Sequence, residues 1–145
     1  MLTLKDLINA TLQFIKPQAT VNSGVVTSPY TVRIQNAVIR CGMCTLTLAV
    51  NNGGANFANG RIGTLATLAE GYRPAFLFNS KAVASNGINS FANRTASMLI
   101  QPNGNIIIDN HGNTDVKEIF ASITYVLGGV ARVFRSLLGR EVIAC

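Results

Sequence analysis

Hydrophobic and polar residues alternate with a period of two through most of the chain, from residue 25 to residue 127. Such alternation is typical of β-strands that bury one face. The apolar members of the clearest runs, each predicted to face inward, are Tyr30, Val32 and Ile34; Cys44, Leu46, Leu48 and Val50; and Ala121, Ile123 and Tyr125. The chain is therefore predicted to be mainly β.

Loops rich in Asn and Gly separate these runs, at residues 51–60, 86–93 and 110–113. A hairpin is predicted over residues 97–109, where Asn103-Gly104 suits a two-residue turn with positive φ. Short strands that are interrupted this often favour an antiparallel β-sandwich or jelly-roll-like domain over βαβ units. We expect this domain to span residues 25–127.

A short helix is predicted at the N-terminus, over residues 1–17. Thr3 can cap it, Asp6 lies in its first turn and Pro17 ends it. Its apolar seam consists of Leu4, Leu7, Thr11 and Phe14. A helix of this length is marginal alone in water. The seam therefore packs either on its own domain or against other chains, where it would form an oligomer interface.

Residues 128–145 are predicted to form a basic amphipathic C-terminal helix after the Gly128-Gly129 hinge, with Arg132 and Arg135 opposite its apolar face. Such a helix can lie on a membrane surface, although a docked helix with a solvated basic side is the more common form. We expect no membrane insertion, because the chain lacks a run of about 18 uninterrupted apolar residues.

Composition narrows the classes of function. The 145 residues fit one domain, and the 48% hydrophobic content excludes a disordered tail. Charged residues make up only 12%, about half of the roughly 25% that is usual, which indicates a surface partly covered by a partner. The net charge is +6, but the basic residues are scattered, so nucleic acid is not an expected partner. The first 18 residues lack the unbroken apolar segment of a signal peptide.

Cys41-Gly42-Met43-Cys44 is the sharpest chemical motif. Zinc would need two more ligands, for which only His111 and Cys145 are available. A redox CxxC belongs at a helix N-terminus in a βαβ unit, whereas this one lies between strand-like runs. We expect free structural thiols, no metal and no cofactor.

No nucleophile accompanies the single histidine, so the chain is predicted not to be an enzyme. The alternative is a small hydrolase or redox protein that uses Cys41, Cys44 and His111.

The loop over residues 86–94 is the candidate ligand-binding site. It combines adaptable amides with one aromatic ring and one cation, contributed by Asn86, Asn89, Phe91, Asn93 and Arg94. This composition suits polar, hydrated recognition. It equally suits an inert loop.

The segment Leu68-Ala-Glu-Gly-Tyr-Arg-Pro74 resembles the Leu-Pro-x-Gly-Tyr-Arg-Pro loop of C-terminal domains in bacteriophage tail, baseplate and head-fibre proteins. The order of the surrounding segments is also similar. Strands at 42–46 and 63–65 precede the loop, and the hairpin Leu-Ile-Gln-Pro-Asn-Gly-Asn-Ile-Ile-Ile and a strand ending in Thr124-Tyr125 follow it. The resemblance covers about residues 28–127. Ala69 replaces the usual Pro, and neither the CxxC nor the terminal helices belong to the pattern.

The resemblance implies a homotrimeric β-sandwich on the virion that attaches to a host cell-surface glycan or protein. It also implies that the Gly-Tyr-Arg-Pro loop is architectural, with Gly71 in a tight turn and Pro74 holding Arg73 extended. The alternative is a purely structural virion protein, such as a head fibre, decoration or adaptor, that contacts other virion proteins and no host ligand. In both cases the chain would be assembled in the bacterial cytoplasm and located in the virion.

Overall fold

The computed structural model describes residues 2–15, 19–86, 94–110 and 112–129. These residues form the helix α1 (Leu4–Ile15), the short 3-10 helix η1 (Glu70–Tyr72) and nine strands. The strands are β1 (Ala19–Val21), β2 (Val26–Thr27), β3 (Thr31–Arg40), β4 (Met43–Asn51), β5 (Arg61–Leu68), β6 (Phe78–Ser85), β7 (Arg94–Ile100), β8 (Asn105–Asp109) and β9 (Glu118–Val126).

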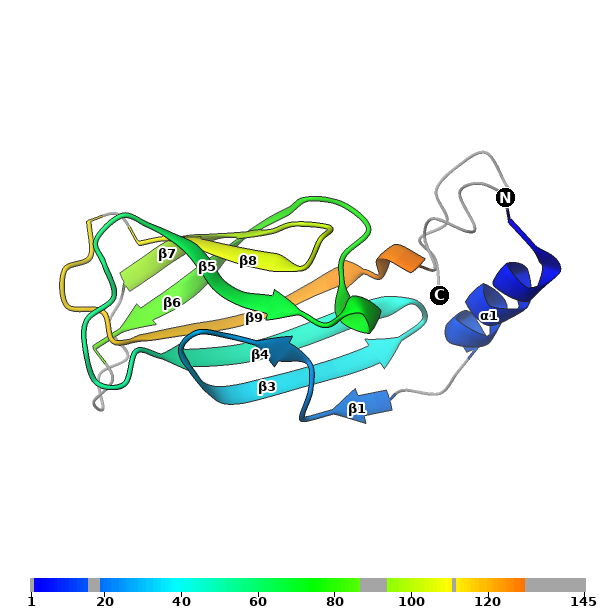
Figure 1. The fold of residues 1–145 in the computed structure, drawn as a ribbon, viewed down its shortest axis with the longest axis horizontal. Coiled ribbons are helices and arrows are strands. Elements are labelled where there is room, and N and C mark those ends of the chain that lie inside the picture. Colours follow the sequence, from blue (N-terminus) through cyan, green and yellow to red (C-terminus); the bar gives the residue numbers. More distant parts are fainter. Residues whose placement is uncertain (1, 16–18, 87–93, 111, 130–145) are drawn as a thin grey trace.

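Antiparallel pairing joins these strands into one continuous sheet, in the order β1-β3-β4-β9-β6-β7-β8-β5-β2. The sheet curls so that β3, β4 and β9 lie across the core from β5, β7 and β8 (Figure 1). The prediction of a mainly β, antiparallel domain is confirmed. The strands belong to one curled sheet, and the finer sandwich or jelly-roll assignment stays a prediction.

Inward-facing side chains of the strands fill the core with apolar groups. Two of the predicted inward rows are buried throughout, with no member more than 7% exposed. They are Cys44, Leu46, Leu48 and Val50 on β4, and Ala121, Ile123 and Tyr125 on β9. Period two is a reliable signal here because regular strands alternate their side chains strictly between two faces.

The side chain of Gln35 joins the two ends of the curled sheet. Gln35 lies on β3, and its Oε1 accepts hydrogen bonds from the backbone N–H groups of Val25 (2.9 Å) and Val26 (3.1 Å). Val26 belongs to β2, the strand at the far edge of the sheet. Val25 is fully buried and Val26 nearly so, and buried N–H groups require a partner. One amide therefore supplies the hydrogen bonds that strand pairing does not.

A bulge in β3 reverses the direction of one predicted inward residue. The pairing of β3 with β4 shifts register between Val32 and Ile34. Val32 packs against the core, whereas Ile34 is 44% exposed on the outer face. The prediction that Tyr30, Val32 and Ile34 share an inward face is therefore wrong for Ile34, because an extra residue moves the following side chain to the other face.

The tight two-residue turn joins β3 to β4, not β7 to β8. Cys41 and Gly42 have φ angles of 53° and 73°, and a type I′ turn requires positive φ at both central positions. Between β7 and β8 the turn has four residues, and the N–H of Gly104 donates to the carbonyl of Gln101 (2.8 Å). The predicted two-residue turn at Asn103-Gly104 is wrong, because the preceding proline suits the second position of a four-residue turn.

The Gly-Tyr-Arg-Pro segment is held from inside the protein. The hydroxyl of Tyr125 donates to the carbonyl of Tyr72 (2.6 Å), and Nε of Arg73 donates to the carbonyl of Leu68 (3.2 Å). The backbone of Arg73 is extended (φ −78°, ψ 141°), and its carbonyl accepts the N–H of Gly128 (3.0 Å). These contacts fix the segment over one end of the core, and the extended Arg73 matches the expectation. Gly71 lies in η1 without a positive φ and with no atom within 4 Å of an added Cβ, so the expected need for glycine there is wrong.

Gly104 packs directly against this segment. The N–H of Leu68 donates to the carbonyl of Gly104 (2.9 Å). A Cβ on Gly104 would lie 2.7 Å from the carbonyl oxygen of Leu68 and 2.9 Å from Nε of Arg73. The φ of Gly104 is +95°, so both the backbone conformation and the available space require glycine.

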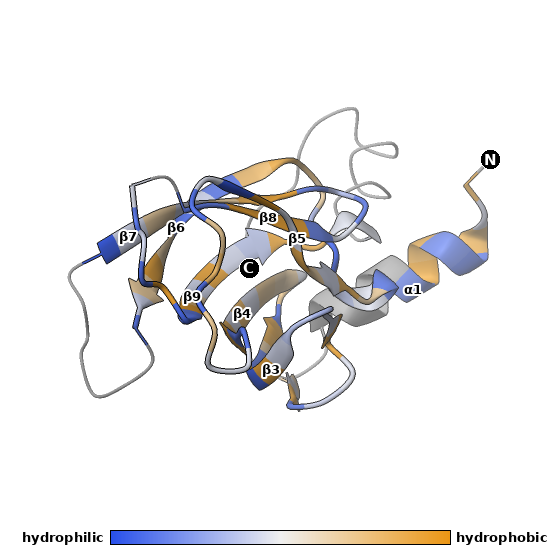
Figure 2. Cartoon of the chain, turned by 60° about the vertical axis from the view of Figure 1, so that its left-hand side comes forward, coloured by the Kyte–Doolittle hydropathy of each residue, from blue (hydrophilic) through white to orange (hydrophobic). Residues whose placement is uncertain are grey.

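The helix α1 has the predicted N-terminal cap. Oγ1 of Thr3 accepts the N–H of Asp6 (3.2 Å), while Oδ2 of Asp6 accepts the N–H of Thr3 (2.8 Å). The hydrogen bond from the Thr3 N–H lowers the pKa of the Asp6 carboxyl. The helix lies beyond one end of the sheet (Figure 1), and hydrophobic and hydrophilic residues alternate along it (Figure 2).

The predicted C-terminal helix over 128–145 falls almost entirely outside the described residues. Among those described, no helix is long and apolar enough to cross a membrane.

Replacing Gly104 by alanine should destabilise the fold by about 2 kcal/mol or more, because backbone strain and steric overlap add together. The matched control is Gly54→Ala, at φ +87° with no atom within 4 Å of the added Cβ, where strain alone should cost about 1 kcal/mol. Urea unfolding followed by circular dichroism measures both. Equal losses in the two variants would contradict the tight contact at Gly104.

Candidate ligand-binding end and outer face of the sheet

The predicted ligand loop connects β6 to β7. The structure describes Asn86 and Arg94, while Asn89, Phe91 and Asn93 lie outside the described residues. Arg94 opens β7 opposite Ala84 of β6, and its guanidinium pairs with the carboxylate of Asp115. The side chains of this ion pair are 38% and 46% exposed, so the pair contributes little to stability. The guanidinium of Arg94 is thus held at the surface beside the β8–β9 loop.

Asn110 organises the neighbouring loops at this end of the sheet. It is fully buried, and its Nδ2 donates to the carbonyl of Ala58 (3.4 Å). Its Oδ1 accepts from Nδ2 of Asn113 (3.1 Å), and its backbone N–H donates to Gly60 (2.9 Å). The sequence analysis placed Asn110 only in a turn. The signal that it missed is an Asn directly after a strand, followed by Gly and Asn. Asn side chains in such positions form hydrogen bonds with the nearby backbone.

Further amides at this end serve the same structural purpose. Oδ1 of Asn59 accepts the N–H of Gly112 (3.0 Å), and Nδ2 of Asn113 donates to the carbonyl of Thr95 (3.2 Å). The loops 52–60 and 110–117 are therefore cross-linked by side-chain hydrogen bonds. Part of the amide content that suggested polar recognition holds the loops in place.

An apolar row crosses the outer face of the sheet over four strands. Strand register places Ile34 opposite Ala49, Ala49 opposite Phe120, and Phe120 opposite Val83. The three larger side chains are 36–44% exposed, although alternation normally places polar groups on a solvated face. Sequence analysis missed this row because the bulge in β3 and the pairing of β9 with β6 create it.

Uncharged polar residues continue this face along β3, β4 and β9. Thr45 and Thr124 lie opposite each other and share a hydrogen bond between their hydroxyls (2.8 Å), and Thr47 and Ser122 do the same at 3.4 Å. We call the outward residues of this region the uncharged face. They are Ile34, Asn36, Val38, Thr45, Thr47, Ala49, Phe120, Ser122 and Thr124. Glu118, the next outward residue of β9 beyond Phe120, pairs with Arg33 of β3 (2.6 Å), so an ion pair borders this face at one end.

The described part of the α1 seam is only partly covered in a single chain. Leu4 is 73% exposed and Ile8 beside the seam is 49% exposed, whereas Leu7 is half-buried. The side chains of Thr11 and Phe14, the other two predicted interface residues, lie outside what the structure describes. An apolar helix face of this kind requires a partner to become stable.

The CxxC motif is divided between a turn and the core. Cys44 faces inward on β4, where it is free and buried, and Cys41 lies in the β3–β4 turn and is disulfide-bonded. The expectation of free thiols is wrong for Cys41. Three cysteines cannot all be paired, but their odd number still allows one disulfide. Within the described residues, no group of three His, Cys, Asp or Glu side chains is placed to hold a metal ion. His111 lies outside them.

No protein-family model matches this chain, and no curated protein matches it either. The resemblance to phage fibre domains therefore depends on the quoted segments. The surfaces described so far that could contact other molecules are the loop end around Arg94 and Asn110, the uncharged face, and the seam of α1.

The thiol of Cys44 should resist alkylation in the folded protein. Burial raises its pKa above the ordinary value, although a hydrogen bond with Tyr125 partly opposes this effect, and only the thiolate reacts. Iodoacetamide labelling at pH 8, followed by mass spectrometry, should be on the order of tenfold slower or more than in the urea-unfolded chain. Equal rates in the two states would contradict the buried position.

Proposed function

We propose that the chain is a non-enzymatic module of a bacteriophage virion, a fibre or receptor-binding domain that attaches the particle to a host surface. The observation that supports this is the meeting of separate motif segments in space. Arg73 of the Gly-Tyr-Arg-Pro loop packs beside Gly104 of the second motif hairpin, and Tyr125 of the last motif strand binds Tyr72. Segments that meet in this way act as one structural unit, whereas unrelated chance matches would be scattered.

The module assembles as a homotrimer through the uncharged face and the seam of α1. Identical copies with a net charge of +6 repel one another through their charged surfaces. The uncharged face lets copies meet without burying unpaired charge, which would be costly. Burial of Ile34, Phe120 and Val83 adds a hydrophobic contribution of about 25 cal/mol per Å². The number of three comes from the resemblance, and other virion proteins are the remaining expected partners.

The loop end carries the attachment function in this proposal, with the loop 86–94 contacting a host glycan or protein. One observation favours the alternative of a purely structural virion protein. The side chains of Asn59, Asn110 and Asn113 already bind other parts of the same chain. Amides used in this way are not available to a ligand, so the alternative requires a direct test.

Replacing Asn89, Phe91 and Arg94 together by alanine should reduce competition by the purified protein for phage adsorption at least about tenfold, because the change removes the polar contacts of the loop. Its melting temperature should stay nearly unchanged, since the Arg94–Asp115 pair is exposed. The control is Asn56→Ala with Lys117→Ala in the neighbouring loops, which should compete like the unmodified chain.

Unchanged competition by the triple variant would remove this loop from the attachment function. Failure of the unmodified protein to compete, with the chain still present in purified particles, would favour the structural alternative. Absence of the chain from particles, measured by mass spectrometry, would contradict both forms of the proposal.

The substitution Phe120→Asp should dissociate the trimer, because it places a charge at the centre of the apolar row. The control is Leu77→Asp, which charges a side chain that is more exposed (55%) and lies outside the uncharged face. Light scattering coupled to gel filtration measures the mass.

In the α1 seam, Leu7→Asp with Phe14→Asp should also weaken the trimer, whereas Lys5→Asp should not.

A mass of one chain for the unmodified protein at micromolar concentration would contradict self-assembly. A stable trimer that tolerates the changes in α1 would assign this helix to anchoring instead. A stable trimer that tolerates Phe120→Asp would place the interface on another face.

A further inference from the structure

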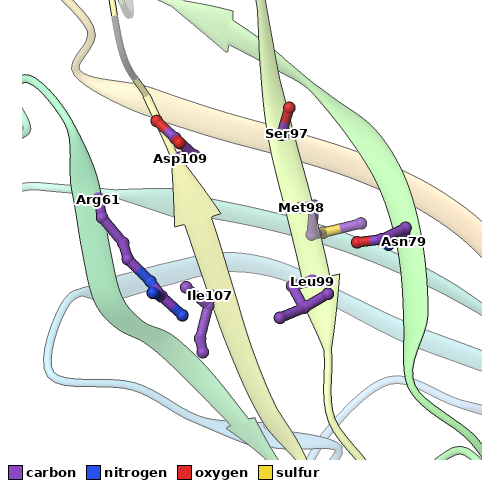
Figure 3. Close-up of a pocket in the computed structure, with 7 residues that line it drawn as sticks. All are labelled: Arg61, Asn79, Ser97, Met98, Leu99, Ile107 and Asp109. Atoms are coloured by element: carbon purple, nitrogen blue, oxygen red, sulfur yellow. The ribbon is translucent and has the colours of Figure 1, made fainter.

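The outer face of the other half of the sheet carries a shallow depression of about 210 Å³. It lies across β5, β8, β7 and β6 and is lined by Arg61, Asn79, Ser97, Met98, Leu99, Ile107 and Asp109 (Figure 3). It is separate from the uncharged face and from the loop 86–94. Its Arg61 and Asp109 ends adjoin the loops 52–60 and 110–117.

Strand register brings the lining together. Arg61 lies opposite Asp109, Asp109 opposite Ser97, Leu99 opposite Ile107, and Asn79 opposite Leu99. Residues far apart in the sequence are thus neighbours on paired strands, where backbone hydrogen bonds fix their spacing. Sites built on strands hold their geometry better than sites built on loops.

Two of the outward-facing lining residues are apolar, although the solvated face of a sheet normally carries polar side chains. Leu99 and Ile107 point outward but are aliphatic, and they pair with each other to form a half-buried apolar floor. Polar groups surround this floor on neighbouring strands. Departures from binary patterning concentrate at functional sites.

The polar groups around the floor are of both hydrogen-bonding kinds. In Figure 3 the guanidinium of Arg61 extends along Ile107 and away from Asp109. Arg61 supplies donors, and the amide of Asn79 and the hydroxyl of Ser97 supply both donors and acceptors. The floor separates these groups by the width of several strands.

This chemistry selects one class of ligand. A metal ion would need more ligands than a single carboxylate. A polyanion would be opposed by Asp109, and a stacked aromatic ligand would find no aromatic ring among the lining residues. A sugar ring offers what fits: hydroxyl groups at its rim for Arg61, Asn79 and Ser97, and a C–H face for the aliphatic floor.

We propose that this depression binds one neutral sugar unit of a glycan. The inference rests on the proposed attachment function, since it names the ligand class and a second location for it. It assigns recognition to the strand surface in addition to the loop end.

Titration of the ¹⁵N-labelled chain with D-glucose, D-galactose and N-acetyl-D-glucosamine, each at millimolar concentration, tests the proposal by NMR. At least one sugar should cause saturable shifts confined to the amides of Ser97, Leu99, Ile107, Asp109 and their neighbours. Inorganic phosphate should cause none there. Absence of saturable shifts with all three sugars, or shifts with phosphate alone, would overturn the proposal.

Variants assign the binding to this surface. Asn79→Ala and Arg61→Gln should each weaken the sugar affinity about tenfold, by loss of a polar contact in a partly desolvated site. Lys81→Ala removes a charge from the same face outside the lining and should change affinity less than about twofold. Asn79 is exposed, so its variant keeps the test valid if Arg61→Gln unfolds. Unchanged affinity in a folded Asn79→Ala chain would overturn the site.

The two proposals fail in different ways. A chain found in virions that binds none of the sugars would overturn the sugar site and leave the virion function standing. Sugar binding by a chain that is absent from purified particles would overturn the virion function and leave the site standing.

Discussion

A single antiparallel sheet can enclose a core only by curling until its two ends meet, and the fold depends on how that junction is closed. The amide of Gln35 closes it, accepting the buried N–H groups of Val25 and Val26. Without this acceptor, two backbone donors would be desolvated with no partner, at a cost of about 1–3 kcal/mol each. Because Gln35 closes the junction from the inner face of β3, the junction itself uses none of the outward side chains of the described strands.

That outer surface has two chemically distinct halves. The uncharged face of β3, β4 and β9 is bordered at one end by the Arg33–Glu118 ion pair, and its apolar row around Phe120 suits burial against another copy of the chain. The face of β5 to β8 carries Arg61 and Asp109 around an aliphatic floor and suits a small polar ligand. A trimer formed through the first half would leave the second facing solvent, so assembly and ligand binding would not compete for the same residues.

Periodicity predicted the regular part of this fold well. The inward rows on β4 and β9 follow from alternation alone, because regular strands keep their phase. The prediction was wrong at Ile34 and at the Asn103-Gly104 turn, since a bulge and a proline-selected turn are set by the partner strand as much as by the local sequence. The depression could not be predicted at all. The predicted hairpin over residues 97–109 already brings Ser97 near Asp109, but Arg61 and Asn79 join them only through the pairing of β5 with β8 and of β6 with β7, which the linear sequence does not report.

The contacts of the motif segments show that these residues hold the fold together. Leu68, Arg73, Gly104 and Tyr125 contact one another or the segment between them, and each uses its polar group or its lack of a side chain to hold the chain in place. Substituting them would damage the fold before it changed a binding surface. A domain can therefore keep these residues and bind quite different ligands, or none. The resemblance thus concerns an architecture, and the recognition that we propose would lie in the loops and on the outer strand faces, where substitutions leave the core intact.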